Sequence, residues 1–304
     1  MIVMKQPSSL RLFFVMQGSV VPKIISKIIG VALLSTLVLM IDRYLIELPH
    51  VSISAVGIFG IALSLFLGFR NNAAYDRWWE ARKLWGQMIA DVRNFCRNAD
   101  IFIQDKEQRE QSFLTLIAFA HLHKGQLRQT DKDAQSEELA NWINREDTMR
   151  FLDHKNPADA ALRDIARRIA KAEKNGVING FGQRAIAETL TSLSNSQAGS
   201  ERIATTPLPF VYSLLVRRTT YLYCFILPFA LIESTSWFAP FFAAVVAYVF
   251  FGLQAVTNEL EHPFSNVQNG LPLDAMCRTI EISICEAMGK NPPAPLEASN
   301  HILT

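Results

Sequence analysis

The feature that most constrains this chain is an unbroken apolar stretch over residues 51–69, which is followed at once by Arg70. Its 19 residues include no charged side chain. At about 1.5 Å per residue, a helix of this length measures roughly 28 Å, which is close to the hydrocarbon thickness of a bilayer. The stretch therefore predicts a helix that crosses a membrane.

Small residues recur at intervals of three and four along this predicted helix. They are Gly57, Gly60, Ser64 and Gly68. At that spacing they form a stripe that a neighbouring backbone can approach closely. We therefore expect these four positions to serve helix packing.

A second, bulky stripe lies beside the small one and consists of Ile61, Leu65 and Phe69, spaced by four. A helix with one small face and one bulky apolar line suits the wall of a narrow conduit. Spacing alone favours a plainer alternative, in which the helix packs in a bundle and the bulky stripe faces lipid.

Composition requires both a membrane part and a water-facing part. The chain has 304 residues, of which 50% are hydrophobic and 19% charged. A net charge of +2 without a basic, aromatic-rich run gives no reason to expect nucleic acid as a partner. The four cysteines form no paired metal-ligand pattern, so we expect reduced structural thiols. The N-terminus shows no cleavage site after a short apolar core, so we expect no removable signal peptide.

Three further apolar segments are long enough to be membrane spans. The first covers residues 28–41, extends to about residues 24–48 and is closed by Pro49. The third and fourth spans cover residues 211–232 and 237–256. The connections within each pair of spans are short, so each pair should be antiparallel.

The water-facing part is predicted to be helical. From Arg70 the chain becomes charged without any turn signal, so one helix is expected to continue from the second span to about residue 100. Further helices are predicted over residues 108–128, 137–144, 147–153, 157–174 and 181–203. We divide the chain into an N-terminal segment with two spans (1–69), a helical region (70–210), two spans (211–257) and a polar C-terminal segment (258–304).

Charge placement predicts the orientation. The loops between spans carry Asp42, Arg43, Glu47 and Glu233. Most basic residues flank the opposite ends, namely Lys23, Lys27, Arg70, Arg77, Arg217 and Arg218. Basic residues favour the cytoplasmic side, so both termini and the helical region are expected there. The predicted fold is an all-α membrane protein with four spans and a cytoplasmic helical body.

The sequence offers little for catalysis or metal binding. His121 and His123 are two residues apart, so on a helix they point about 200° apart and cannot share a metal. The same geometry separates Glu259 from Glu261, which we expect to be solvated or ion-paired. No phosphate loop, nucleophile elbow or HExxH motif occurs. We expect no cofactor, no metal and no enzymatic activity.

The spans themselves contain no acid or base that lies clearly at mid-membrane. Such a group would mark a proton relay or a coupling-ion site. Its absence disfavours a secondary transporter and favours a passive conduit or a simple anchor.

Several segments together resemble the signature of the bestrophin family, in particular its bacterial members. They occur at 66–72 (FLGFRNN), 75–82 (YDRWWEAR), 84–86 (LWG), 201–203 (ERI), 206–210 (TPLPF), 261–264 (EHPF) and 271–274 (LPLD). They follow the family's order and span most of the chain. Each motif is weak alone, and their combination is specific.

The resemblance implies a homopentameric ion channel of the bacterial inner membrane. In such a channel the second span lines a narrow hydrophobic neck, and the family's neck positions fall on Ile61, Leu65 and Phe69. A second constriction of the family would fall near Ile178 and Phe181, where the match is poor. Apolar rings of this kind conduct when wetted and close by dewetting.

One departure from the family concerns calcium. Animal bestrophins sense calcium with a run of acids after the Pro-Phe motif, whereas residues 265–270 here (SNVQNG) contain no carboxylate. Calcium requires several oxygen ligands, including anionic ones. The chain is therefore expected not to be calcium-activated.

The leading hypothesis is a pentameric channel for small monovalent ions, with the bilayer and the other subunits as its partners. The family resemblance implies chloride, but an uncharged neck cannot select by sign, so a cation-passing pore is also compatible. The alternative is a membrane-anchored oligomeric scaffold without a pore. The two hypotheses differ in whether Ile61, Leu65 and Phe69 face a central axis or lipid.

Overall fold

A computed structural model describes residues 1–3 and 18–304 of the chain. Every long regular element in these residues is a helix, and strand-type pairing there is limited to isolated bridges of Ile302 with Ile2 and with Ser299. The expected all-α fold is confirmed for this part of the chain. The N-terminal segment expected before the first span lies mostly outside the described residues, because residues 4–17 are not among them.

The described residues form two compact units. The apolar unit comprises residues 18–78 and 207–262, and the polar unit comprises residues 1–3, 79–206 and 263–304. The sequence places the first change of character at residue 70, whereas the units divide nine residues later, at residue 79. The difference has a physical reason, because Arg70 and Arg77 form hydrogen bonds with the end of the last apolar helix.

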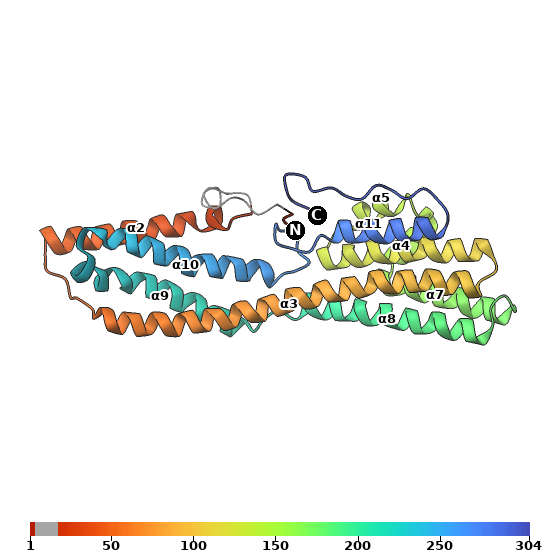
Figure 1. Cartoon of the computed structure of the whole chain (residues 1–304), viewed down its shortest axis with the longest axis horizontal. Coiled ribbons are helices and arrows are strands. Elements are labelled where there is room, and N and C mark those ends of the chain that lie inside the picture. Colours follow the sequence, from red (N-terminus) through yellow and green to blue (C-terminus); the bar gives the residue numbers. More distant parts are fainter. Residues whose placement is uncertain (4–17) are drawn as a thin grey trace. The chain divides into compact units, whose positions relative to one another are not determined.

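The apolar unit is a bundle of four helical segments. They are α2 (Val21–Tyr44), the first part of α3 (Ile53–Phe102), α9 (Phe210–Thr235) and α10 (Ala239–Leu260). A short 3-10 turn, Ser236–Phe238, joins α9 to α10. Helix α2 packs against α10 and α9, and Figure 1 shows it beside α10. The shared core includes Val31, Leu63, Tyr223 and Phe251.

Three helical stretches of the described chain are long and apolar enough to cross a membrane. These are Val21–Tyr44, the apolar part of Ile53–Phe102, and Phe210–Leu260. The last stretch holds both α9 with 26 residues and α10 with 22 residues. Each of these helices alone exceeds the roughly 20 residues that a crossing needs.

Helix α3 is a single element of 50 residues, about 75 Å long. Figure 1 shows it as one uninterrupted ribbon. The absence of a turn signal after Arg70 predicted this continuity, and the prediction is confirmed. In the polar unit α3 buries Trp85, Met88, Val92 and Phe95.

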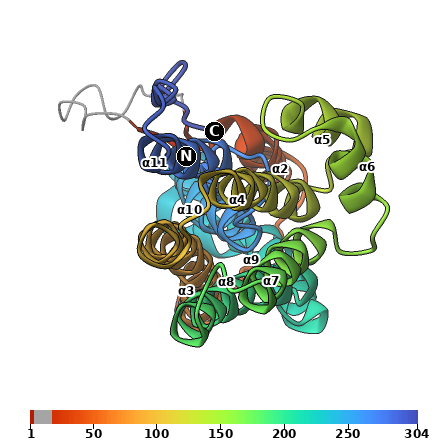
Figure 2. The same cartoon turned by 90° about the vertical axis from the view of Figure 1, so that its right-hand side faces the viewer.

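Besides this second part of α3, the described residues of the polar unit form six helices. They are α4 (Lys106–Arg128), α5 (Lys132–Leu139), α6 (Arg145–Leu152), α7 (Pro157–Lys174), α8 (Gly180–Thr205) and α11 (Leu273–Ala287). Helix α4 packs against both α7 and α11, and the end-on view in Figure 2 shows it between them.

Side-chain caps explain where the predicted helix bounds are wrong. Asp105 accepts hydrogen bonds from the backbone of Glu107 and Gln108, so α4 begins before residue 108. Asp131 accepts from Ala134, so the helix predicted over 137–144 begins at Lys132 instead. Satisfied N-terminal N–H groups stabilise these earlier starts. Helix α11 was not predicted as a separate element.

Candidate functional site

The bulky stripe of α3 is exposed in the single chain. The side chains of Ile61, Leu65 and Phe69 are 73%, 58% and 57% exposed. They lie on one face of α3, because they are spaced by four. An apolar line of this kind is costly in water and needs lipid or another subunit to cover it.

The opposite face of α3 is what holds the helix in the apolar unit. Val56, Leu63 and Leu67 are each at most 4% exposed and belong to the core of that unit. The hydroxyl of Tyr212 on α9 also donates to the carbonyl oxygen of Phe66 at 3.1 Å. The core contacts therefore set the rotation of α3 and leave the bulky stripe pointing outward.

The stripe of small residues is divided between two roles within one chain. Gly60 is buried against α9, where an added Cβ would lie 2.6 Å from the Tyr223 hydroxyl oxygen. Gly57, Ser64 and Gly68 are exposed, and a Cβ at Gly57 or Gly68 would meet no atom within 4 Å. The chain's own helices thus use Gly60, and the other three positions stay open to a neighbour.

Polar groups at the end of the apolar stretch are buried and paired. Arg70 is 1% exposed, and its Nη2 donates to Glu261 Oε2 at 2.9 Å and to Asn258 Oδ1 at 3.0 Å. Arg77 Nε donates to the Glu261 carbonyl oxygen at 2.8 Å. These contacts tie α3 to the end of α10 and keep the Arg70 charge away from the bulky stripe.

Glu259 and Glu261 both serve in ion pairs. Glu259 binds the ammonium of Lys23 on α2, and Glu261 binds Arg70 on α3. The two carboxylates therefore engage different helices, as their spacing on a helix requires. Each carboxylate thus connects α10 to another helix of the apolar unit.

The two positions expected at a second constriction differ in exposure. Ile178 is 4% exposed and belongs to the buried set of the polar unit, whereas Phe181 in the first turn of α8 is 83% exposed. A side chain that is buried within its own chain is not available to line a constriction. Phe181 is therefore the candidate that this geometry keeps.

His121 and His123 contact different surroundings, as their spacing predicted. His121 Nε2 lies 2.7 Å from Glu281 Oε1, and its Nδ1 lies 2.9 Å from Glu138 Oε1. Burial lowers the pKa of His121, but the hydrogen bonds to Glu138 and Glu281 outweigh burial, so its pKa lies above the usual value. Within the described residues, no group of His, Cys, Asp and Glu side chains suits a metal ion.

The polar unit contains a buried ionic network that the sequence did not predict. Lys124 binds Glu138 and Asp274, and Arg128 Nη1 binds Asp274 Oδ2 at 2.7 Å. Together with the His121 contacts, the network joins α4, α5 and α11. Its partners lie up to 160 residues apart, so no local pattern indicates it. The only available signal was Asp274 in the family motif LPLD.

Comparison with known proteins decides the family. Residues 1–286 match the family model described as bacterial/fungal bestrophin protein. The chain belongs to this bestrophin family. Relatives of this bestrophin include the voltage-dependent anion channel-forming protein mll4386 of Mesorhizobium japonicum, 44% identical over 98% of the chain and 96% of the relative.

Other relatives and solved structures agree with that assignment. The voltage-dependent anion channel-forming protein YneE of Escherichia coli K12 is 38% identical over 94% of this bestrophin and 93% of its own length. A crystal structure of a bacterial bestrophin homologue from Klebsiella pneumoniae superposes with a TM-score of 0.84 at 32% identity. That match covers 88% of this chain and all of the solved one.

Proposed function

We propose that this bestrophin is the subunit of a homopentameric channel that passes small monovalent anions across the bacterial inner membrane. The observation that carries the proposal is the charge-free, exposed stripe of Ile61, Leu65 and Phe69 on α3. The names of the relatives, which describe anion channel-forming proteins, support the choice of anions.

The proposed conduit follows from five copies of the stripe. Around a central axis they would form three successive apolar rings, each contributed by one position. Such a constriction conducts when it is wetted and closes by dewetting. The exposed Gly57, Ser64 and Gly68 would let the neighbouring subunit approach α3 closely.

The proposed neck does not select ions by sign. Its three positions are uncharged, and the next basic residue, Arg70, is buried and paired with Glu261. Selection of anions is therefore assigned to charges outside the neck. The exposed Phe181 is proposed to form a second apolar ring in the cytoplasmic part of the channel.

The proposed topology has four crossing helices, α2, the first part of α3, α9 and α10. Both termini and the polar unit lie in the cytoplasm, because Lys23, Arg70 and Arg217 flank the same ends of these helices. Gating by calcium is not part of the proposal. Residues 265–270 carry no carboxylate, and Asp274, the next acid, binds Lys124 and Arg128.

The test is single-channel recording of the purified pentamer in planar bilayers under asymmetric potassium chloride, with a calcium chelator present. The decisive variant replaces Ile61, Leu65 and Phe69 together by alanine. A matched control replaces Ile29, Leu33 and Leu37 on α2, which have the same spacing and are 51%, 65% and 57% exposed.

We expect a wild-type current that reverses near the chloride equilibrium potential and persists in the chelator. The α3 triple variant should conduct more than the wild type, because the neck is wider and wets more easily, and the α2 triple variant should conduct like the wild type. Equal currents in all three proteins would contradict the neck assignment. A current that reverses near the potassium equilibrium potential would show that the channel passes cations and not anions. The absence of current from verified pentamers would favour a scaffold without a pore.

A further inference from the structure

A pocket of about 580 Å³ opens in the apolar unit between α2, α9 and α10. Its wall is almost entirely apolar and includes Val31, Leu34, Phe225 and Phe251. The volume lies within the range of about 300–1,000 Å³ that is usual for small-ligand sites. Nothing in the proposed conduction mechanism uses this pocket, because α3 supplies the neck.

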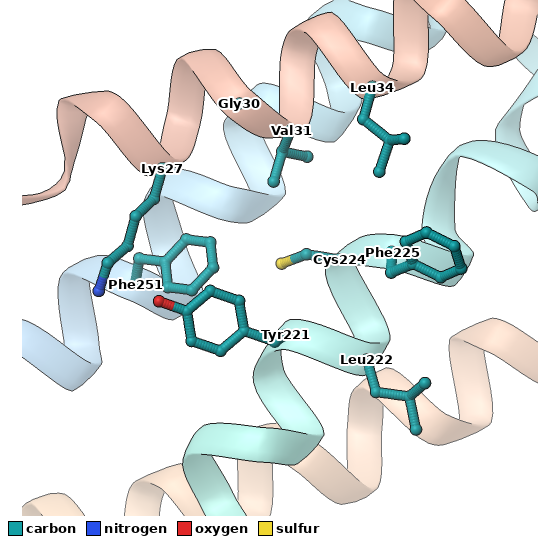
Figure 3. Close-up of a pocket in the computed structure, with 9 residues that line it drawn as sticks. All are labelled: Lys27, Gly30, Val31, Leu34, Tyr221, Leu222, Cys224, Phe225 and Phe251. Carbon is teal, nitrogen blue, oxygen red and sulfur yellow. The ribbon is translucent and has the colours of Figure 1, made fainter.

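Two polar groups mark one end of the pocket. Figure 3 shows the Lys27 ammonium and the Tyr221 hydroxyl at the same end, while Leu34 and Phe225 lie toward the other. The Lys27 Nζ lies 5.7 Å from the Tyr221 ring centroid and 5.1 Å from the Phe251 ring centroid. The two rings hold the ammonium over the pocket through cation–π attraction.

Lys27 has no carboxylate partner in the described part of the chain, whereas Lys23, one turn earlier on α2, pairs with Glu259. A half-buried ammonium in apolar surroundings is stabilised by an anion. Two further cations, Arg217 and Arg218, are exposed one turn before Tyr221 on α9. Lys27 is the cation that lines the pocket, and its ammonium gives the polar end a positive charge that matches an anionic group.

The pocket runs from this charged end into the apolar interior. Lys27 and Leu34 are seven residues apart on α2, which corresponds to about 10 Å along the helix axis. Lys27 lies in the second turn of α2, and Leu34 lies near the middle of the helix. A ligand that fills the pocket must therefore have an anionic head and an apolar tail.

We propose that this pocket binds an anionic phospholipid from the cytoplasmic leaflet. The phosphate accepts hydrogen bonds from the Lys27 ammonium and the Tyr221 hydroxyl. One acyl chain packs along Val31, Leu34 and Phe225. Cytoplasmic leaflets are rich in anionic lipids, and basic residues close to the membrane surface attract them. A lipid in the pocket would contact both α2 and α9 where their side chains leave space between them.

The test is native mass spectrometry of the full-length protein titrated with phosphatidylglycerol or with phosphatidylcholine of the same acyl chains. The wild type should bind phosphatidylglycerol more tightly. Lys27→Gln should weaken the binding of phosphatidylglycerol about fivefold and leave the binding of phosphatidylcholine unchanged. Leu34→Trp fills the apolar end and should weaken both lipids. Leu33→Trp places the same ring one residue away, on a position that is 65% exposed, and should weaken neither.

Four results would overturn the proposal. If the wild type binds the two lipids equally, the pocket does not recognise the headgroup. If Lys27→Gln leaves phosphatidylglycerol binding unchanged, Lys27 does not contact the headgroup. Displacement of phosphatidylglycerol by millimolar inorganic phosphate would reassign the polar end to free phosphate. A change of oligomeric state in Leu34→Trp but not in Leu33→Trp would show that a second subunit fills the pocket. If Leu34→Trp does not fold, Lys27→Gln alone decides.

Discussion

The buried pair of Arg70 and Glu261 allows a quantitative prediction about the link between α3 and α10. Their side chains are 2% and 8% exposed, and the Nη2–Oε2 distance is 2.9 Å. Arg70 Nε and Nη1 are buried and have no hydrogen-bond partner among the described residues. The guanidinium keeps its charge in proteins. The buried positive charge of Arg70 is therefore stabilised by the Glu261 carboxylate.

Glu261→Gln removes the charge and keeps the shape of the side chain. Breaking a buried ion pair from one side costs about 3–5 kcal/mol, and we expect the lower end because Asn258 still accepts from Arg70. A loss of about 3 kcal/mol lowers Tm by roughly 6 °C for a chain of this size. The double variant Arg70→Met with Glu261→Gln should return to within about 1 kcal/mol of the wild type, because no unpaired charge remains.

The assay is thermal unfolding of the purified protein in one detergent, followed for the wild type, both single variants and the double variant. Glu188→Gln is the control, because its partner Arg184 and Glu188 itself are 82% and 67% exposed and such pairs contribute little. Additive losses in the double variant would refute the reasoning. They would mean that the two side chains stabilise the protein through separate contacts.

Two further predictions concern buried positions. His123 is stacked between Trp85 and Phe119, and burial lowers its pKa to about 3. Below about pH 6.5 the unfolded chain binds a proton that the folded chain does not, so stability is lost as pH falls. His123→Phe should therefore stabilise by about 2 kcal/mol more at pH 5 than at pH 8, and an equal change of Tm at both pH values would contradict this. Gly60→Ala should destabilise by about 1–3 kcal/mol, because the new Cβ meets the Tyr223 hydroxyl oxygen at 2.6 Å. Gly57→Ala meets no atom within 4 Å and serves as its control, so similar melting curves for the two variants would refute the packing assignment.

Much of the helical architecture could be predicted from local patterns. The apolar stretches gave the cores of α2, α3, α9 and α10, and the helix predicted over residues 157–174 has the same bounds as α7. Helix bounds were less predictable, because Asp105 and Asp131 act as caps and move the starts of α4 and α5. A capping aspartate is indistinguishable in sequence from an aspartate within a polar loop. These helix starts are therefore defined only by the backbone hydrogen bonds of the folded chain.

The candidate site shows a similar division. Spacing and family resemblance singled out Ile61, Leu65 and Phe69, and the structure places these side chains on an exposed face. Ile178 was chosen from a poor match and is buried, whereas Phe181 is exposed. The network of His121, Lys124 and Asp274 could not be anticipated, because its members come from α4 and α11 and meet only in the folded chain.

By itself, the sequence determined that the chain is helical, which stretches can cross a bilayer, and which residues share a face of α3. These properties depend on local hydrophobicity and on a period of 3.6 residues, both of which can be read along one segment. Tertiary structure alone decided that Val56, Gly60 and Leu63 face the chain's own core while Gly57, Ile61 and Leu65 do not. Periodicity defines the faces of a helix, but the side chains of other helices, here Tyr223 of α9, determine which face they cover.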